Sequence, residues 1–240
     1  ARFLGISEFG PQSLVYHEGR AFRVDRALLK EAGDREDGRL NTKSRALCAS
    51  CGASHDGEHP ERCHVCNASL SNAYPITNLY RIENVGTRPA ERITSNDEER
   101  KRQGFELQTT FSFDESSYTA KLDLEDDIGE ILSVDYAQAA YISRINKGLR
   151  RRKDQAQVGF HINPKTGVWL GQPSEDGADN NPERIVQLIV PLVEDRKNAL
   201  LVRFNQSWVA DLGQDEEKTL TTVQHALARG IEAVFQLEEG

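Results

Sequence analysis

Methionine is absent from the 240-residue chain, and cysteine occurs only four times. So few cysteines exclude the disulfide framework that small secreted proteins use. No run of about 18 consecutive apolar residues is present, so the sequence predicts no membrane-spanning helix and no membrane partner. The first residues also lack the basic segment and apolar core of a signal peptide. Because the chain opens at Ala1 without a methionine, we expect it to be a piece of a longer protein.

Positive charge is in the minority. The chain has 30 Lys and Arg residues against 38 Asp and Glu residues, which gives a net charge of −8. This balance is not that of a generally basic nucleic-acid-binding protein, although a local basic patch remains compatible with it. At roughly 150 residues per domain, the length predicts one large domain or two small ones.

The sequence motifs of common enzyme classes are also missing. The chain contains neither of the two glycine-rich phosphate-binding patterns, no G-x-S-x-G turn and no H-E-x-x-H helix. His17, His161 and His225 are isolated from one another, and no pair of carboxylates has a distinctive spacing. We therefore expect no catalytic residues in this segment; an enzyme with an unrecognised site remains an alternative.

All cysteines lie in two C-x2-C motifs separated by eleven residues: Cys48, Cys51, Cys63 and Cys66. Two such motifs deliver four thiolates to a tetrahedral ion at a Zn–S distance of about 2.3 Å. Because four sulfurs fill the coordination sphere, the sequence predicts structural Zn²⁺ without an open catalytic position. An iron–sulfur cluster or a redox dithiol pair remains an alternative. His55, His59 and His64 lie in the same segment, and one of them replacing a cysteine is a further alternative.

A basic run at residues 144–153 (RINKGLRRRK) contains no acidic residue. Its six cations are candidate contacts for nucleic-acid phosphates. They are Arg144, Lys147, Arg150, Arg151, Arg152 and Lys153. Cations at the C-terminal end of a helix also complement the helix dipole, and charge runs are often simply solvated, so a structural role stays open.

The hydrophobic patterns predict an α+β fold with mixed, mainly antiparallel sheets, a few helices and an inserted four-cysteine zinc ribbon. Strands are expected within residues 1–31, 74–82, 105–113, 118–124, 160–162, 168–170, 185–193, 199–204 and 231–237, with a hairpin turn at residues 17–20. Helices are expected at residues 94–102, 131–149 and 216–229, the last ending at Gly230.

Composition divides the chain into three segments, expected to form one composite domain. Residues 1–44 are an N-terminal β segment with a linker, residues 45–70 hold the zinc-binding motifs, and residues 71–240 form an α/β body. Because thiolate ligands persist in a reducing compartment, we expect a cytoplasmic protein.

Several stretches resemble a known family. They are EFGPQSLVYHEG at residues 8–19, the two C-x2-C motifs, LYRIENVGTRPAERITSNDEERKRQGFELQTTFSF at residues 79–113, RINKGLR at residues 144–150 and TLTTVQHALARGIEAVFQLEE at residues 219–239. Together they resemble the zinc-binding C-terminal domain of large bacterial superfamily 2 helicases of the DEAD/DEAH type. The same domain type occurs in mitomycin-repair helicases and in a subunit of the DISARM phage-defence system.

The resemblance implies a four-cysteine zinc site on an α/β body that follows RecA-like motor lobes in the same protein. ATP would be used only by those lobes, because their motifs are absent here. We therefore expect an accessory zinc-binding domain of a DNA helicase or translocase that engages or guides DNA, in phage defence or DNA repair. Its partners would be DNA and the motor lobes or a partner subunit. The alternative is a protein–protein scaffold domain of a defence complex without direct nucleic-acid contact.

Overall fold

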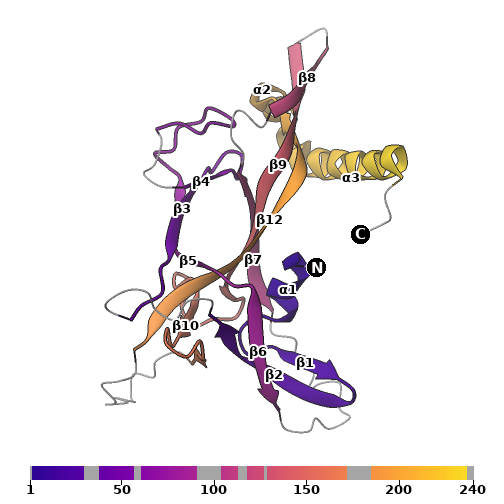
Figure 1. Cartoon of the computed structure of the whole chain (residues 1–240). Helices are drawn as coiled ribbons and strands as arrows, with labels where there is room; N and C mark the ends of the chain where they lie inside the picture. The colour runs from indigo at the N-terminus through magenta and orange to yellow at the C-terminus, as the bar shows by residue number, and fades with distance from the viewer. Residues whose placement is uncertain are drawn as a thin grey trace. The chain divides into compact units, whose positions relative to one another are not determined.

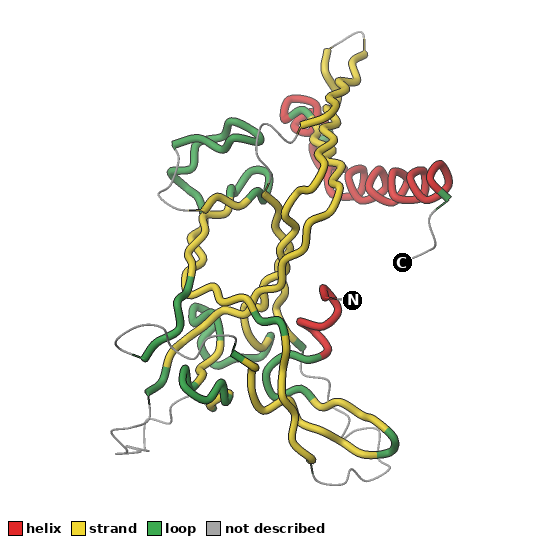
Figure 2. Tube along the Cα trace, viewed as in Figure 1, coloured by secondary structure: helices red, strands yellow, loops and turns green. Residues whose placement is uncertain are grey.

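The computed structural model describes residues 2–29, 38–56, 61–90, 104–112, 118–126, 129–171 and 185–236. The helix expected at residues 94–102 lies outside these residues. Strands predominate over helices along the trace, which confirms the expected α+β class (Figure 2). No helix among the described residues is long and apolar enough to cross a membrane.

The described part of the chain forms two sheets, labelled in Figure 1. A three-stranded sheet has the order β1-β2-β6, and its strands are Leu14–His17, Arg20–Leu28 and Asn84–Pro89. A nine-stranded sheet has the order β11-β10-β12-β5-β3-β4, and β9 pairs with β12, β7 and β8 off this path. Its strands are β3 Lys43–Leu47, β4 Ser54–Asp56, β5 Tyr74–Arg81, β7 Phe105–Ser112, β8 Tyr118–Asp126, β9 Gly129–Leu149, β10 Phe160–Ile162, β11 Trp169–Leu170 and β12 Gln187–Phe204.

Spatial contacts divide the chain into two compact units. Unit 1 consists of Ala1–Glu115 and Ala139–Lys197, and unit 2 of Ser116–Gln138 and Asn198–Gly240. Both long strands, β9 and β12, contribute residues to both units. The divisions expected at residues 44 and 70 are based on the composition of the sequence, whereas these two units are defined by which residues lie close together in space.

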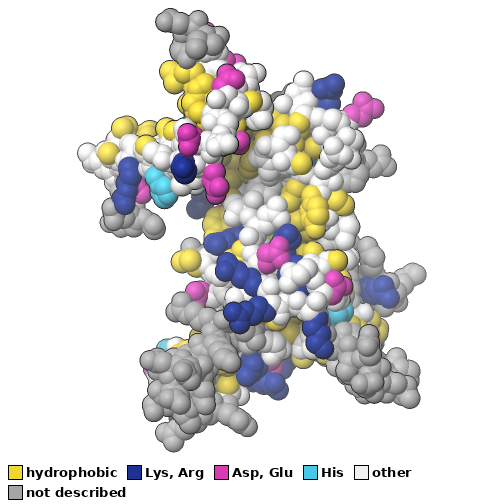
Figure 3. All heavy atoms as spheres, turned by 180° about the vertical axis from the view of Figure 1, so that it is seen from behind, with side chains coloured by type: hydrophobic (Ala, Val, Ile, Leu, Met, Phe, Trp, Pro, Cys, Tyr) yellow, Lys and Arg dark blue, Asp and Glu magenta, His cyan; other side chains and the backbone are white. Residues whose placement is uncertain are grey.

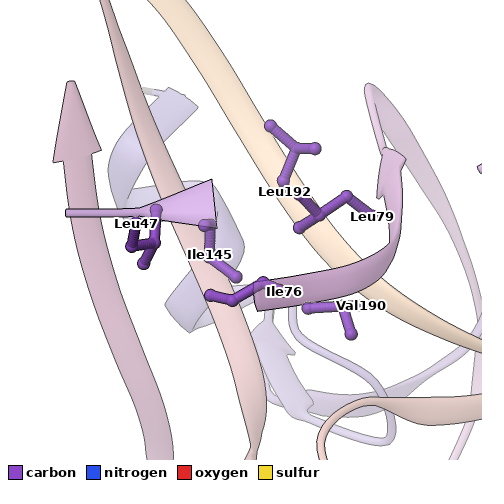
Figure 4. Close-up of a cluster of buried hydrophobic side chains, with 6 residues drawn as sticks. All are labelled: Leu47, Ile76, Leu79, Ile145, Val190 and Leu192. Carbon is purple, nitrogen blue, oxygen red and sulfur yellow. The ribbon is translucent and has the colours of Figure 1, made fainter. Parts of the chain in front are cut away.

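Hydrophobic clusters among the described residues hold unit 1 together. The first joins β3, β5, β9 and β12 through six buried side chains, which are drawn as sticks in Figure 4. They are Leu47, Ile76, Leu79, Ile145, Val190 and Leu192. The second cluster packs Trp169 against Ile162, Ile189, Ala27 and Leu40. Trp169 is therefore a core residue.

The hairpin expected at residues 17–20 is confirmed, because β1 and β2 pair antiparallel from Leu14↔Arg23 to His17↔Arg20. Glu18 and Gly19 have positive φ angles of 47° and 72°, as a two-residue hairpin loop requires. The chain begins differently from the expected strand, because α1 spans Arg2–Glu8. In a strand, Leu4 and Ile6 would lie on the same face. In this short helix Ile6 is buried and Leu4 is exposed, so the two side chains lie on different faces.

The helix expected at residues 131–149 is wrong, because this segment belongs to β9. The strand pairs with β8 from Asp126↔Gly129 to Tyr118↔Ala137, and with β7 from Ser112↔Tyr141 to Phe105↔Leu149. Apolar residues at steps of three and four suggested one helical face. The buried positions instead alternate at Ser133, Asp135 and Ala137, with the period of two of a strand.

Two further boundaries differ from the expectation. The strands expected at residues 185–193 and 199–204 form one continuous strand, β12, because the polar residues between them remain extended. The strand expected at residues 231–237 is wrong: α3 runs from Glu216 to Phe235, through Gly230. Gln236 ends α3 in a left-handed conformation. Unit 2 also contains α2, Gln206–Asp211, and a 3-10 turn, Gly213–Asp215.

Candidate metal centre and basic surface

The first cysteine motif, which we call knuckle 1, is the tight turn from Cys48 to Gly52 directly after β3. The amide of Gly52 donates to the carbonyl of Cys48 (2.9 Å), and the amide of Cys48 donates to the carbonyl of Ala53 (2.9 Å). Gly52 has a φ angle of 76°, which glycine adopts without the steric cost that other residues meet. The turn brings the sulfurs of Cys48 and Cys51 together.

Knuckle 2, from Cys63 to Asn67, repeats these hydrogen bonds at the same offsets. The amide of Asn67 donates to the carbonyl of Cys63 (2.8 Å), and the amide of Cys63 donates to the carbonyl of Ala68 (2.9 Å). Asn67 has a φ angle of 58° and takes the place of Gly52, because asparagine tolerates this conformation better than most residues. The two knuckles are therefore equivalent in backbone structure.

The four cysteine sulfurs form a compact cluster. All four lie within 4.8 Å of one another, and the Cys48–Cys66 and Cys51–Cys63 sulfur pairs are each 3.6 Å apart. Disulfide sulfurs are about 2.05 Å apart, so these are free thiols. A tetrahedral ion at about 2.3 Å from each sulfur requires sulfur–sulfur edges of about 3.8 Å. The cluster therefore fits a four-coordinate structural metal site.

The electrostatics of the cluster also favour a cation at its centre. Burial and the neighbouring Cys63 thiolate raise the pKa of the Cys51 thiol, and burial raises the pKa of Cys63. Burial opposes the ionisation of Cys48 too, but backbone N–H groups of Cys51 and Ser50 point at its sulfur and lower its pKa. Several thiolates this close together repel one another, and a bound cation removes that repulsion.

Strand β7 anchors knuckle 1. The hydroxyl of Thr110 donates to the carbonyl of Gly52 (2.7 Å), and the hydroxyl of Ser54 donates to the carbonyl of Phe111 (3.2 Å). Thr110 and Ser54 are buried, so each hydroxyl gains a partner that it needs inside the protein. The metal site is thus fixed to the strand that also pairs with the basic end of β9.

Two histidines connect knuckle 2 to β4. The Nδ1 atoms of His55 and His64 are 3.1 Å apart, and their rings meet edge to face at a centroid distance of 4.7 Å. Burial lowers the pKa of His55, and the neighbouring His64 lowers it further, which keeps His55 neutral at pH 7. The metal-ligating group among the described residues is made of the four cysteines alone. His55 and His64 therefore act as a link between elements, and His59 lies outside the described residues.

The basic run occupies the last residues of β9 and the turn that comes after this strand. Because this segment is a strand, the cations do not complement a helix dipole. Arg144 is half-buried, and its Nη1 donates to the carbonyl of Phe3 (3.2 Å). Arg150, Arg151 and Lys153 are exposed. On the face shown in Figure 3, Lys and Arg side chains gather with a few Asp and Glu side chains between them.

Sequence reasoning missed the partner of two of these cations. Glu106 of β7 binds Lys147 through Oε1 (2.8 Å) and Arg152 through Oε2 (2.7 Å). Hydrogen bonds from Lys147 and Arg152 hold the pKa of Glu106 below its ordinary value. The run contains no acid in sequence, yet the register Glu106↔Gly148 places a carboxylate beside it in space. Only the pairing of β7 with β9 could have revealed this.

Sequence reasoning also missed a buried ion cluster. The guanidinium of Arg45, 7% exposed, binds Glu194 through Nη2 (2.8 Å), Ser143 through Nη1 (2.8 Å) and Asp56 through Nε. The hydroxyl of Ser143 in turn donates to Glu194 (2.8 Å). These residues come from β3, β4, β9 and β12, so the cluster ties four strands together. Their separation in sequence leaves no pattern to recognise.

Comparisons with known proteins leave the family open. No protein-family model, curated protein or solved structure matches this chain.

Proposed function

We propose that the chain is an accessory zinc-binding domain of a DNA helicase or translocase, and that it engages or guides DNA for a motor. The observation that carries this proposal is the group of exposed cations Arg150, Arg151 and Lys153 at the end of β9, in a chain of net charge −8. Phosphate contacts from such a local group supply sequence-independent affinity for DNA. The sequence resemblance to helicase-associated zinc domains points in the same direction.

Zinc is the metal we propose for the cysteine cluster. Four thiolates in tetrahedral spacing suit Zn²⁺, which has no redox chemistry and no need for a further ligand. Cys48 and Cys63 are buried, and Cys51 and Cys66 are partly covered, so no position remains for substrate. The metal would stabilise the two knuckles against β7 and take no part in a reaction.

The test is the fluorescence anisotropy of labelled single-stranded and duplex DNA at about 50 and 200 mM salt. The variant carries Arg150→Gln, Arg151→Gln and Lys153→Gln. A matched control carries Lys165→Gln, Lys197→Gln and Lys218→Gln, three exposed cations elsewhere, and therefore changes the net charge equally. We expect binding that weakens with salt, and a slope of log affinity against log salt that is shallower by about 2 to 3 in the variant only.

Absence of DNA binding by the folded, zinc-loaded chain would overturn this proposal in favour of a protein–protein scaffold. One observation favours that second candidate. Helix α3 has no buried residue, and Val234 and Phe235 near its end are 74% and 67% exposed. Exposed apolar side chains of this kind are typical of surfaces that bind another protein.

A further inference from the structure

A cavity of about 330 Å³ lies beside the exposed cations of the basic run. Its basic wall is formed by Arg151, Arg152 and Lys153, which follow directly after β9. Among the described residues that line it, none is Asp or Glu. By contrast, the carboxylates of Glu83 and Glu194 outnumber the one cation, Arg81, in the cavity of about 410 Å³ near α1, which makes that cavity less suited to an anion. The smaller cavity therefore combines a concave shape with positive charge.

Two of the three cations remain available to a ligand. Arg152 is committed to Glu106 and to the carbonyls of Leu149 (3.0 Å) and Gln155 (2.9 Å). Arg151 and Lys153 are exposed and have no hydrogen bond or ion pair within the described ranges of the chain. A phosphate group at the mouth of the cavity would gain two charge-assisted contacts without breaking an existing one.

The remaining walls suit a nucleobase. Phe160 and Leu170 provide apolar surface, and Phe160 is held by edge-to-face contacts with Phe105 and Trp169, both at centroid distances of 6.0 Å. Polar groups are supplied by Gln12, Gln157 and His161. Unpaired bases are recognised by this combination of aromatic or apolar contact and hydrogen bonds to the base edge.

The imidazole of His161 is suited to hydrogen bonding rather than to charge pairing. Burial lowers its pKa, so the ring is neutral at pH 7 and offers one donor and one acceptor nitrogen. Its Nε2 lies 3.5 Å from Nε2 of Gln157. This neutral pair lines the same cavity as the cations, so the cavity offers both hydrogen-bonding groups for a base and charges for a phosphate.

We infer that this cavity binds a single unpaired nucleotide of a DNA strand, with the base against Phe160 and Leu170 and the phosphate on Arg151 and Lys153. The inference rests on the proposed function and adds a preference for single strands to it. The volume lies at the small end of the range of ligand sites, about 300 to 1,000 Å³. A base within a duplex would have to leave its stack and its pairing partner to enter, at a cost of a few kcal/mol.

Gly171 offers a way to block the cavity without removing any charge. It lines the cavity, is exposed, and an added Cβ would meet no atom within 4 Å. The variant Gly171→Leu should therefore fold and fill the space. Gly230 of α3 is a matched control, because an added Cβ there also meets nothing within 4 Å and it lies in another part of the chain.

The experiment compares three labelled DNAs of about 12 nucleotides by anisotropy: a single strand with bases, an abasic strand of equal charge, and a duplex. We expect Gly171→Leu to weaken binding of the base-containing strand about tenfold, to the affinity of the abasic strand. Binding of the duplex and of the abasic strand should not change. The variant Gly230→Leu should match the original protein, with circular dichroism and zinc content confirming the fold of both variants.

Equal affinity for strands with and without bases, or an unchanged affinity in Gly171→Leu, would overturn the inference. If salt-sensitive DNA binding persists in that case, the proposed function stands without the pocket. If no DNA binds, the proposed function fails. Calorimetry with free thymidine monophosphate then tests whether the cavity binds a nucleotide independently of DNA binding. Binding that is lost in Gly171→Leu supports a nucleotide site, and absence of binding rules the site out.

Discussion

The carboxylate of Glu106 on β7 holds the ammonium of Lys147 on β9, with 2.8 Å between Oε1 and Nζ. Its other oxygen holds Arg152, so one acid neutralises part of the basic run from the neighbouring strand. The run is therefore divided in space: Lys147 and Arg152 are 17% and 7% exposed in their side chains, whereas Arg151 and Lys153 face solvent. The division separates cations that hold the fold from cations that are free to bind.

Replacing Glu106 with glutamine should lower stability at pH 7 by roughly 1 kcal/mol, because two ion pairs at a partly exposed site are lost. The pKa of Glu106 is lowered in the folded state, so its contribution is fully present above the ordinary value of 4.5 and disappears as the pH falls through the lowered value. Urea unfolding of both proteins from pH 7 to pH 3 should show the difference closing in acid. A constant difference at every pH would contradict this.

The zinc site predicts roughly one zinc ion per folded chain, measured by elemental analysis. Cys63→Ser, which removes a buried ligand, should lose the metal and lower the melting temperature, because metal binding contributes folding free energy. Ser50→Ala, at an exposed non-ligand position of knuckle 1, is the control and should retain both. Visible absorption with bound iron would instead indicate an iron–sulfur cluster. A folded chain without any metal would eliminate the site.

The Arg45 cluster predicts unequal effects at its two acidic partners. Arg45→Ala should cost about 3 kcal/mol, because it leaves the carboxylate of Glu194, 16% exposed, without its charge partner. Asp56→Asn should cost less than about 1 kcal/mol, because the side chain of Asp56 is 63% exposed and water replaces the contact. Chemical denaturation of the three proteins measures both. Equal losses would show that the cluster is not buried as described.

The conformation of β9 can be tested at two neighbouring alanines. Ala139 has a φ angle of 56°, which costs a non-glycine residue about 1 to 2 kcal/mol, so Ala139→Gly should stabilise the protein by roughly 0.5 to 1 kcal/mol. Ala140 is fully buried without a positive φ, so Ala140→Gly should destabilise it by about 1 kcal/mol. Opposite signs in urea unfolding would support this strand geometry. A helix would lose stability at both positions.

The parts of the fold that depend on local chemistry could be predicted from the sequence. The turn at Glu18 and Gly19 carries its own conformational requirement, and the C-x2-C spacing by itself specifies two turns that present sulfur. Phe105–Ser112 alternates apolar and polar residues and is a strand as expected. In each case the residues that determine the structure are neighbours along the chain.

The parts of the fold that depend on residues distant in the sequence could not be predicted. Strand β9 contains Ile145 and Leu149 at helical spacing, and only pairing with β7 and β8 decides that the segment is extended. The reverse holds for the end of α3, where Ile231 to Phe235 looks like a strand but lacks a strand to pair with among the described residues. The ion pair between Glu106 and Lys147 could not be predicted for the same reason, because the two residues are brought together only by the pairing of neighbouring strands.

The discontinuity of the two compact units has a consequence for synthesis. Unit 2 needs both Ser116–Gln138 and Asn198–Gly240, and about 60 residues lie between these segments. At a translation rate of about 5 to 20 residues per second, the first segment waits roughly 3 to 12 seconds for the second. During that time the edge of β9 that pairs with β12 has no partner, and Leu122 and Leu124 of the same hairpin are exposed, as they also are in the complete structure. An unpaired strand edge beside exposed apolar side chains is the condition under which nascent chains associate wrongly. No single uninterrupted stretch shorter than residues 116–240 contains the whole of unit 2, so truncations inside that range leave it unfinished.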